Sequence, residues 1–331
     1  MPLIRVVNLC KEFRVSKHQR GAWGAVKNLF TTQYRLVRAV DGVSFNIEAG
    51  ELVGYLGPNG AGKSTTIKML TGILVPTSGE VNIGGHIPWK DRVPYVKGIG
   101  VVFGQRTNLW WDLPVIESLD LLKHVYRISE DRYERNLAEF REMLGLDEFL
   151  HTPVRSLSLG QRMRADLAGA LLHDPQIIFL DEPTIGLDVV AKERIRQFIK
   201  SINRERSVTV ILTTHDLGDV EKLCARVMMI DRGKLLFDGA PGELVQRFGG
   251  ERELVVDLAE DYANVEIDGA RVASRDERQV TYRFVRGSIS ASDLIQRLSA
   301  QYRILDLSVQ EPQIEDTVRR IYEQGLLRDE G

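Results

Sequence analysis

Apolar and polar residues alternate along the first part of the chain and predict strands there. Residues 3–13 alternate over their whole length, which is typical of a half-buried strand. Residues 15–38 break the alternation and are interpreted as an insertion, after which 43–48 and 51–56 predict two more strands. A glycine-rich loop follows, and a helix is predicted next, over 63–70. The pattern therefore places a glycine-rich loop between a strand and a helix.

Short, continuous apolar runs separated by helical stretches make up the middle of the chain. Strands are predicted at 97–103, 176–180 and 208–213, and mostly helical stretches at 114–172 and 188–203. A short apolar run without alternation is typical of a strand that is buried on both faces. Strands that alternate with helices predict an α/β fold built around a mainly parallel sheet.

The pattern changes near residues 249–250, after a hairpin predicted from 227–230 and 234–237. The elements predicted beyond this point are strands at 253–258, 278–285 and 303–309 and helices at 291–302 and 314–324. They are too few to extend the main sheet. We therefore expect a separate, small α+β domain over 250–331.

Composition and charge narrow the class of protein. The 331 residues are typical of about two domains. With 44 basic and 46 acidic residues the net charge is −2, which argues against a nucleic-acid binder held by bulk charge. Cys10 and Cys224 have no disulfide or metal-ligand spacing and favour a reducing cytoplasm. No apolar run reaches the ~20 residues that cross a bilayer, and no signal peptide is expected, so membrane work would need a partner.

The glycine-rich loop at 57–64 fits the phosphate-binding pattern G-x-x-x-x-G-K-S/T. Glycines let backbone N–H groups curl around phosphates, and the start of the following helix attracts anions. Lys63 is expected to reach the β- and γ-phosphates, and Ser64 to bind Mg²⁺. The predicted ATP-binding residues of this segment are Gly57, Pro58, Asn59, Gly60, Ala61, Gly62, Lys63, Ser64 and Thr65.

Two acids, Asp181 and Glu182, follow the apolar strand at 176–180. Ligands bind at the strand ends of α/β sheets, so an acidic pair there suits catalysis. Asp181 is expected to hold Mg²⁺, directly or through water, and Glu182 to polarise the attacking water as a general base. An acidic loop after a core strand is the alternative, and the phosphate loop favours the catalytic interpretation.

The segment LSLGQR at 157–162 precedes a helix and resembles the signature motif (LSGGQ) of ABC ATPases. Ser158 and Gln161 also form the pattern of a helix capping box, and both interpretations can hold together. In the family this motif contacts ATP held by the opposite subunit, which implies that role for Ser158, Gly160 and Gln161. Leu159 replaces the first glycine, and its side chain either crowds the nucleotide or points away. We expect an effect on hydrolysis more than on ATP binding.

The remaining motifs of the family also match in order. Gln105 resembles the glutamine that senses Mg²⁺ and the γ-phosphate, and His215 resembles the switch histidine that touches the γ-phosphate. Residues 186–188 resemble the D-loop, which implies that Asp188 lies at a dimer interface and acts on the partner's ATP. Phe13 stands where the family places an aromatic ring against adenine, and a core position is its alternative.

The resemblance covers about residues 1–245 and implies the fold of the family. That fold is a P-loop ABC ATPase domain, with a RecA-like core, an antiparallel β subdomain and a helical subdomain expected at about 107–160. The family hydrolyses ATP with Mg²⁺, and two copies bind two ATP in a head-to-tail sandwich. The segment 15–38 would be an insertion in this domain, and 250–331 an accessory domain.

The number of ATPase modules, the absence of coiled-coil patterns and the residues around the motifs indicate the type of ABC protein. Translation-type members carry two ATPase modules and repair-type members long coiled coils, and neither pattern occurs here. Residues 57–77 and 181–188 resemble exporter ATPases of the sodium-efflux and drug-resistance kind. That group implies one or more separate integral-membrane permease chains, a position on the cytoplasmic face of the membrane, no nucleic acid and no periplasmic binding protein. A polysaccharide-exporter ATPase and a soluble regulatory ABC ATPase without a membrane partner are the alternatives.

Two further segments are candidates for contact with a membrane or a partner. The insertion is basic, with Lys17, Arg20, Lys27, Arg35 and Arg38 and no acid, and Trp23, Val26 and Phe30 fall near helical spacing. Such a stretch binds an anionic membrane or a partner, or it is a solvated loop. Trp110 and Trp111 fall where the family builds the groove for the permease's coupling helix, and core packing is their alternative.

Overall fold

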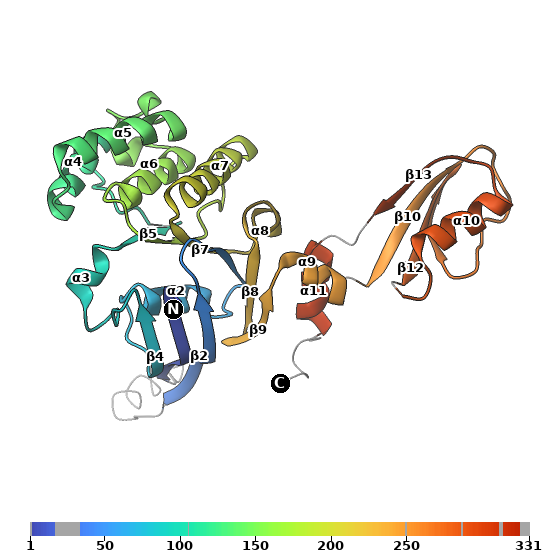
Figure 1. Cartoon of the computed structure of the whole chain (residues 1–331), viewed down its shortest axis with the longest axis horizontal. Helices are drawn as coiled ribbons and strands as arrows, with labels where there is room; N and C mark the ends of the chain where they lie inside the picture. The colour runs from blue at the N-terminus through green and yellow to red at the C-terminus, as the bar shows by residue number, and fades with distance from the viewer. Residues whose placement is uncertain are drawn as a thin grey trace, which may run out of the picture. The chain divides into compact units, whose positions relative to one another are not determined.

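The computed structural model describes residues 2–16, 34–104, 106–248, 250–285, 287–310 and 314–324. It divides the chain into two compact units, Met1–Asp238 and Gly239–Gly331 (Figure 1). Among the described residues, no helix combines the length and the apolar character that crossing a membrane requires.

A six-stranded sheet forms the centre of the first unit. Its order is β5-β6-β7-β3-β8-β9, with bounds Ile99–Phe103, Ile177–Asp181, Thr209–Thr214, Leu52–Leu56, Arg226–Asp231 and Lys234–Gly239. The pairs from β5 to β8 are parallel, as the continuous apolar runs predict. Every residue of β3 and β7 is buried. The chain crosses between parallel strands through α2 (Lys63–Leu70), α7 (Val189–Arg206) and α8 (Leu217–Leu223).

A three-stranded antiparallel sheet lies in the same unit, in the order β2-β1-β4. The bounds of β1, β2 and β4 are Ile4–Ser16, Tyr34–Ile47 and Ser78–Ile83. Strand pairing reaches into both ends of the predicted insertion, because Val15 pairs with Arg35 and Ser16 with Tyr34. This end of the ribbon is exposed on both faces, so the alternation that marks a half-buried strand is missing there. Residues 17–33 lie outside the described residues, with Lys17, Arg20, Trp23, Val26, Lys27 and Phe30.

Helices make up the rest of the first unit. They are α3 (Arg92–Val96), α4 (Val115–Tyr126), α5 (Glu130–Leu144) and α6 (Leu159–Leu171), with 3-10 turns at Leu146–Glu148 and Val154–Ser156. Figure 1 shows α4, α5, α6 and α7 grouped together, and α6 also packs against β5. Gly145 ends α5 at a φ of 60°, a left-handed conformation that glycine adopts without steric cost.

The second unit contains a four-stranded antiparallel sheet in the order β11-β12-β10-β13. Its elements are α9 (Pro241–Phe248), β10 (Glu251–Leu258), β11 (Arg271–Asp276), β12 (Gln279–Val285), α10 (Ala291–Gln301), β13 (Ile304–Gln310) and α11 (Ile314–Gln324). Val280, Tyr282 and Phe284 of β12 share a buried face, and Leu294 and Leu298 of α10 belong to the same core. Helix α9 packs against α11, so this unit begins ahead of the predicted boundary at 250.

Candidate active site

The phosphate loop lies between β3 and α2, and Lys63 is the first residue of that helix. Gly60 and Gly62 have φ values of 82° and 113°, a region that other residues rarely adopt. A Cβ on Gly62 would come within 2.4 Å of the Ala39 carbonyl oxygen of β2, so a side chain does not fit there. Because the first turn of α2 carries no acidic residue, its N-terminus keeps its attraction for an anion.

The Lys63 ammonium is buried within this loop. It donates hydrogen bonds to the carbonyl oxygens of Gly57 at 2.6 Å and Pro58 at 3.3 Å, and lies 3.8 Å from Oε1 of Glu182. Burial lowers the pKa of Lys63, while the charges of Glu182 and Asp181 act in the opposite direction. A phosphate beside this ammonium would favour its charged form in the same way.

Ser64 and Asp181 meet at the end of β6. The Ser64 hydroxyl donates to Oδ1 of Asp181 at 3.3 Å, and the Thr213 hydroxyl donates to the same oxygen at 2.5 Å. A hydroxyl and a carboxylate are the hard oxygen ligands that Mg²⁺ prefers beside phosphates. The pair therefore fits the metal predicted from the sequence. Gln105, the third predicted metal ligand, lies outside the described residues.

Glu182 lies in a turn directly after β6. Its φ of 55° is unusual for a residue other than glycine, and two hydrogen bonds from its backbone N–H stabilise it. These bonds go to the Thr213 carbonyl at 3.0 Å and the Thr213 hydroxyl at 3.1 Å. Nδ1 of His215, which is half exposed, lies 3.3 Å from Oε1 of Glu182.

These residues share one cavity of about 580 Å³. It is lined by residues of the phosphate loop, β5, β6 and the turn after β7, among them Asn59, Ser64, Phe103, Arg106, Asp181, Glu182 and His215. The loops that follow β3, β6 and β7 thus converge at the carboxyl edge of the sheet, as ligand sites in parallel sheets do. The structure brings together most of the catalytic residues predicted from the sequence.

The signature segment and the D-loop share a second cavity, of about 460 Å³, whose lining contains no residue of the phosphate loop. The predicted capping box is present at the start of α6: the Ser158 N–H donates to Gln161 Oε1 at 2.9 Å, and the Gln161 N–H donates to Ser158 Oγ at 3.3 Å. Asp188 caps α7 and accepts from the Ala191 N–H at 2.8 Å. Ser158, Gly160, Gln161 and Asp188 all line this cavity.

Leu159 lies against the D-loop turn. A Cβ on Gly186 would come within 3.1 Å of Leu159 Cδ2, and Gly186 has a φ of 70°. Leu159 also lines the second cavity. Its side chain therefore packs on the turn that leads to Asp188, within the same chain.

Phe13 and the tryptophan pair lie on the surface. Phe13 is 38% exposed on β1, with the Lys11 ammonium 5.4 Å from its ring centroid, so it is not a core residue. Trp110 and Trp111 are 42% and 50% exposed, which also rules out simple core packing. The Arg162 guanidinium of α6 lies 5.7 Å from the Trp111 ring centroid.

The sequence did not predict a buried ion pair, between Arg196 and Asp219, that lies next to the site. Asp219 of α8 is fully buried and accepts from Arg196 Nε of α7 at 2.7 Å. It also accepts from the hydroxyls of Thr184, in the loop after Glu182, and Thr214, next to His215. The polar Asp219 on an otherwise apolar helix face was the available signal. Its partners are distant in sequence, so periodicity could not find them.

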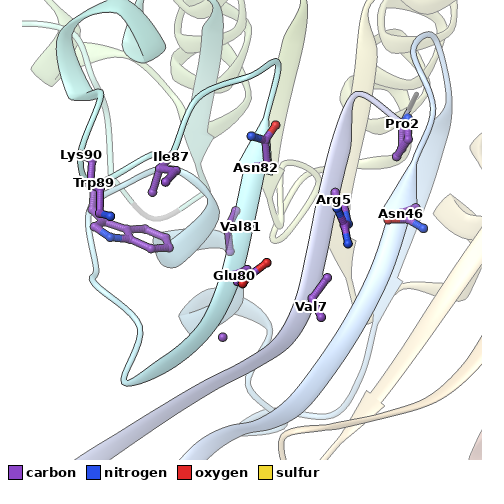
Figure 2. Close-up of a pocket in the computed structure, with 11 residues that line it drawn as sticks. Pro2, Arg5, Val7, Asn46, Glu80, Val81, Asn82, Ile87, Trp89 and Lys90 are labelled. Atoms are coloured by element: carbon purple, nitrogen blue, oxygen red, sulfur yellow. The ribbon is translucent and has the colours of Figure 1, made fainter.

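A further hollow, of about 780 Å³, lies over the antiparallel sheet. Figure 2 shows Arg5, Asn46 and Glu80 on the strands and Trp89 and Lys90 on the neighbouring loop. None of its lining residues belongs to the phosphate loop or to the acidic pair. It is therefore separate from the candidate active site.

Known proteins resemble this chain over the same region. A profile of the ABC transporter family matches residues 40–185. The linearmycin resistance ATP-binding protein LnrL of Bacillus subtilis is 36% identical over 212 residues, which are 64% of this chain and 68% of that protein. NatA of Bacillus subtilis, an ABC transporter ATP-binding protein, is 34% identical over 64% of this chain and 85% of its own length. A Nod factor export ATP-binding protein of Rhizobium meliloti is 35% identical over 73% of this chain and 75% of that protein.

Solved structures of ABC ATPases also resemble this chain. A dimeric ATP-binding cassette, bound to ADP and Pi in a post-hydrolysis state, matches with a TM-score of 0.60 and 29% identity, over 72% of this chain and 98% of that chain. A Clostridium perfringens protein, part of the ABC transporter complex CbiONQ, matches with a TM-score of 0.60 and 25% identity, over 74% of this chain and 91% of that chain. The chain therefore belongs to the ATP-binding subunits of ABC transporters and is an ATPase.

Proposed function

We propose that this chain powers an exporter in which two copies close on two ATP molecules and drive a separate membrane permease from its cytoplasmic face. The observation that carries the proposal is the separation of two half-sites in one chain. The phosphate loop, Asp181 and Glu182 line one cavity, while Ser158 and Asp188 line another. A second copy placed head to tail would bring the second half-site of each chain to the ATP of the other.

The chemistry of turnover follows from the first cavity. Lys63 and the loop amides bind the phosphates, and bound Mg²⁺, held by Ser64 and Asp181, would neutralise charge on the phosphate oxygens. Glu182 accepts the proton of the water that attacks the γ-phosphorus, and ADP leaves as the P–O bond breaks. His215 lies within 3.3 Å of Glu182, so it can hold this carboxylate in place and reach the γ-phosphate.

The interfaces of the assembly are proposed from exposed apolar residues. Val189 and Val190 are 80% and 75% exposed directly after Asp188, which suits burial against a second copy. Trp110 and Trp111 suit a contact with the permease, because exposed tryptophans with a neighbouring arginine are typical of interface anchors. The names of the relatives, linearmycin resistance and Nod factor export, support export as the direction of transport.

The substitution Glu182→Gln tests this proposal. The amide keeps the size of the side chain but cannot accept the water's proton, so turnover should fall by about 10² to 10⁴ while ATP binding is retained. The ATP-loaded variant should be a dimer by light scattering. Glu205→Gln, at an exposed glutamate near the end of α7, serves as the matched control and should turn over normally.

Second substitutions in the Glu182→Gln protein separate the two half-sites. Adding Lys63→Ala should abolish both ATP binding and the dimer. Adding Ser158→Phe should leave ATP binding in place and abolish only the dimer, because Ser158 would act on the other chain's ATP. An ATP-loaded Glu182→Gln protein that stays monomeric would contradict the sandwich.

A further inference from the structure

Asp166 holds a loop of the active site on helix α6. It is only 3% exposed, and its Oδ1 accepts from the Thr107 hydroxyl at 2.8 Å and from the Asn108 backbone N–H at 2.9 Å. Both donors belong to residues 106–111, the segment that leads from β5 to α4. We name these residues the linking segment.

The linking segment starts at the catalytic cavity. Just ahead of it, the Gly104 N–H donates to the Asp181 carbonyl at 2.8 Å, and a Cβ on Gly104 would come within 2.3 Å of the Glu182 carbonyl oxygen. Arg106 lines the cavity itself. A shift of the backbone at Asp181 and Glu182 therefore meets Gly104, and it reaches Arg106 through Phe103, which pairs with Asp181 and accepts from the Arg106 N–H at 3.0 Å.

The linking segment ends at the exposed tryptophans. The Trp110 N–H donates to the buried hydroxyl of Ser118 on α4 at 3.3 Å, and the Trp111 carbonyl accepts from the Arg155 N–H at 2.9 Å. The Trp111 ring also lies near Arg162, one turn ahead of Asp166 on α6. One short segment thus joins the catalytic cavity to the surface proposed for the permease.

Helix α6 links the same segment to the second half-site. Ser158 caps this helix and Asp166 lies eight residues further on, which is about 12 Å along the axis. Leu109 packs on the helix as well, because a Cβ on Gly169 would come within 3.2 Å of Leu109 Cδ2. Asp166, this apolar contact and the Trp111–Arg162 contact are where the linking segment is fixed to α6.

A carboxylate at this position is costly for stability alone. Burial raises the pKa of Asp166 to about 6, although the hydrogen bonds from Asn108 and Thr107 and the charge of Arg162 act in the opposite direction. An apolar residue would pack there without that desolvation cost. What the carboxylate adds is an acceptor that fixes the conformation of the loop.

We propose that Asp166 is a positioning residue that fixes the linking segment to α6, so that ATP binding moves this segment, the signature turn and the Trp110-Trp111 surface together. The inference rests on the proposed function, because it assumes that ATP binding closes the site. Asp166 itself does not contact the nucleotide in this scheme.

Tryptophan fluorescence of the full chain tests the inference. The parent protein carries Glu182→Gln together with Trp23→Phe and Trp89→Phe, so that its emission comes from Trp110 and Trp111. Adding MgATP should change this emission. Asp166→Ala should lose the change while its Kd for ATP stays within about twofold of the parent, as expected for a site outside the nucleotide contacts. Asp166→Asn should retain the change, because its Oδ1 still accepts both hydrogen bonds.

The outcomes separate this inference from the proposed function. A parent that does not bind ATP overturns both, whereas a parent that binds ATP without a change in emission overturns the inference alone. It is also overturned if Asp166→Ala responds like the parent, or if Asp166→Asn and Asp166→Ala lose the response equally. Thr107→Val removes one of the two donors and should reduce the change, and it replaces Asp166→Ala if that variant does not fold.

Discussion

The side chain of Leu159 lies where the family pattern has a glycine, and its contact with Gly186 gives it a role of its own. The δ-methyl group fills the space beside the turn before Asp188, so the signature segment and the D-loop are packed together within one chain. A small residue in place of Leu159 would leave that space empty. At the scale of single residues, this contact bears on turnover more directly than on ATP binding.

Leu159→Ala should lower turnover with little change in KM for ATP. The truncation removes the contact with Gly186 and loosens Asp188, and for a half-buried leucine it should cost about 1 kcal/mol of stability. Steady-state kinetics of the full chain measure both parameters. A rise in turnover would show instead that the leucine crowds the nucleotide.

Asp166 should make stability depend on pH. Its pKa of about 6 in the folded chain lies above the ordinary value of 3.8, so the folded state resists ionisation. The free energy of unfolding should therefore fall as pH rises from about 4 to above 6, by roughly 3 kcal/mol in total. Asp166→Asn lacks this contribution. In urea unfolding, the free energy of unfolding of the variant should therefore rise relative to that of the parent as pH increases. Parallel pH curves for the two proteins would contradict the shift.

At the scale of elements, α7 and α8 stabilise the turns that carry Glu182 and His215 through a buried ion pair. The ion pair between Arg196 and Asp219 is buried, and Asp219 also accepts from Thr184 and Thr214. Thr184 lies two residues after Glu182, and Thr214 directly precedes His215. The two helices therefore fix the geometry of the site without contacting its cavity.

Asp219→Ala should destabilise the chain by about 3–5 kcal/mol, because the buried Arg196 would lose its buried counter-charge and keep only the exposed Glu193 carboxylate at 3.6 Å. Turnover should fall too, since both threonines lose their acceptor. Chemical denaturation and ATPase rates measure the two effects. The control is Asp147→Ala, which removes an exposed pair with Arg141 and should cost less than about 1 kcal/mol. Equal losses in the two variants would contradict this role.

At the scale of the whole molecule, the chain consists of two units with separate cores. The catalytic residues all lie in Met1–Asp238. The second unit has its own apolar core, formed by β10, β12 and α10, and its helices α9 and α11 pack on each other. We propose that it is an accessory domain that can fold independently.

Each unit should therefore fold when expressed alone. The fragment 239–331 should give a cooperative thermal transition by circular dichroism, and the fragment 1–238 should still bind ATP. The full chain serves as the reference for both. A second fragment that is unfolded in isolation would show that its core depends on the rest of the chain.

The sequence predicted the core elements better than the peripheral ones. The strands β3, β6 and β7 are short, mostly apolar runs, the helix α2 follows the phosphate loop, and all four lie close to the predicted bounds. Strands β4 and β11 and helices α3, α8 and α9 were not predicted. Both of those strands are largely exposed, and the three helices are only five to eight residues long, so each offers few positions from which a period could be found.

Local chemistry is what the sequence by itself determined about this protein. The phosphate loop, the acids after β6 and the capping box at Ser158 each depend on neighbours within a few residues. Their patterns can therefore be recognised from the sequence. Only the tertiary structure decided which side chains meet across the sheet. Thr213 reaches Asp181 because β7 lies beside β6, and Asp166 reaches Thr107 because α6 packs on β5. Such contacts depend on the order of strands and the packing of helices, which local periodicity does not specify.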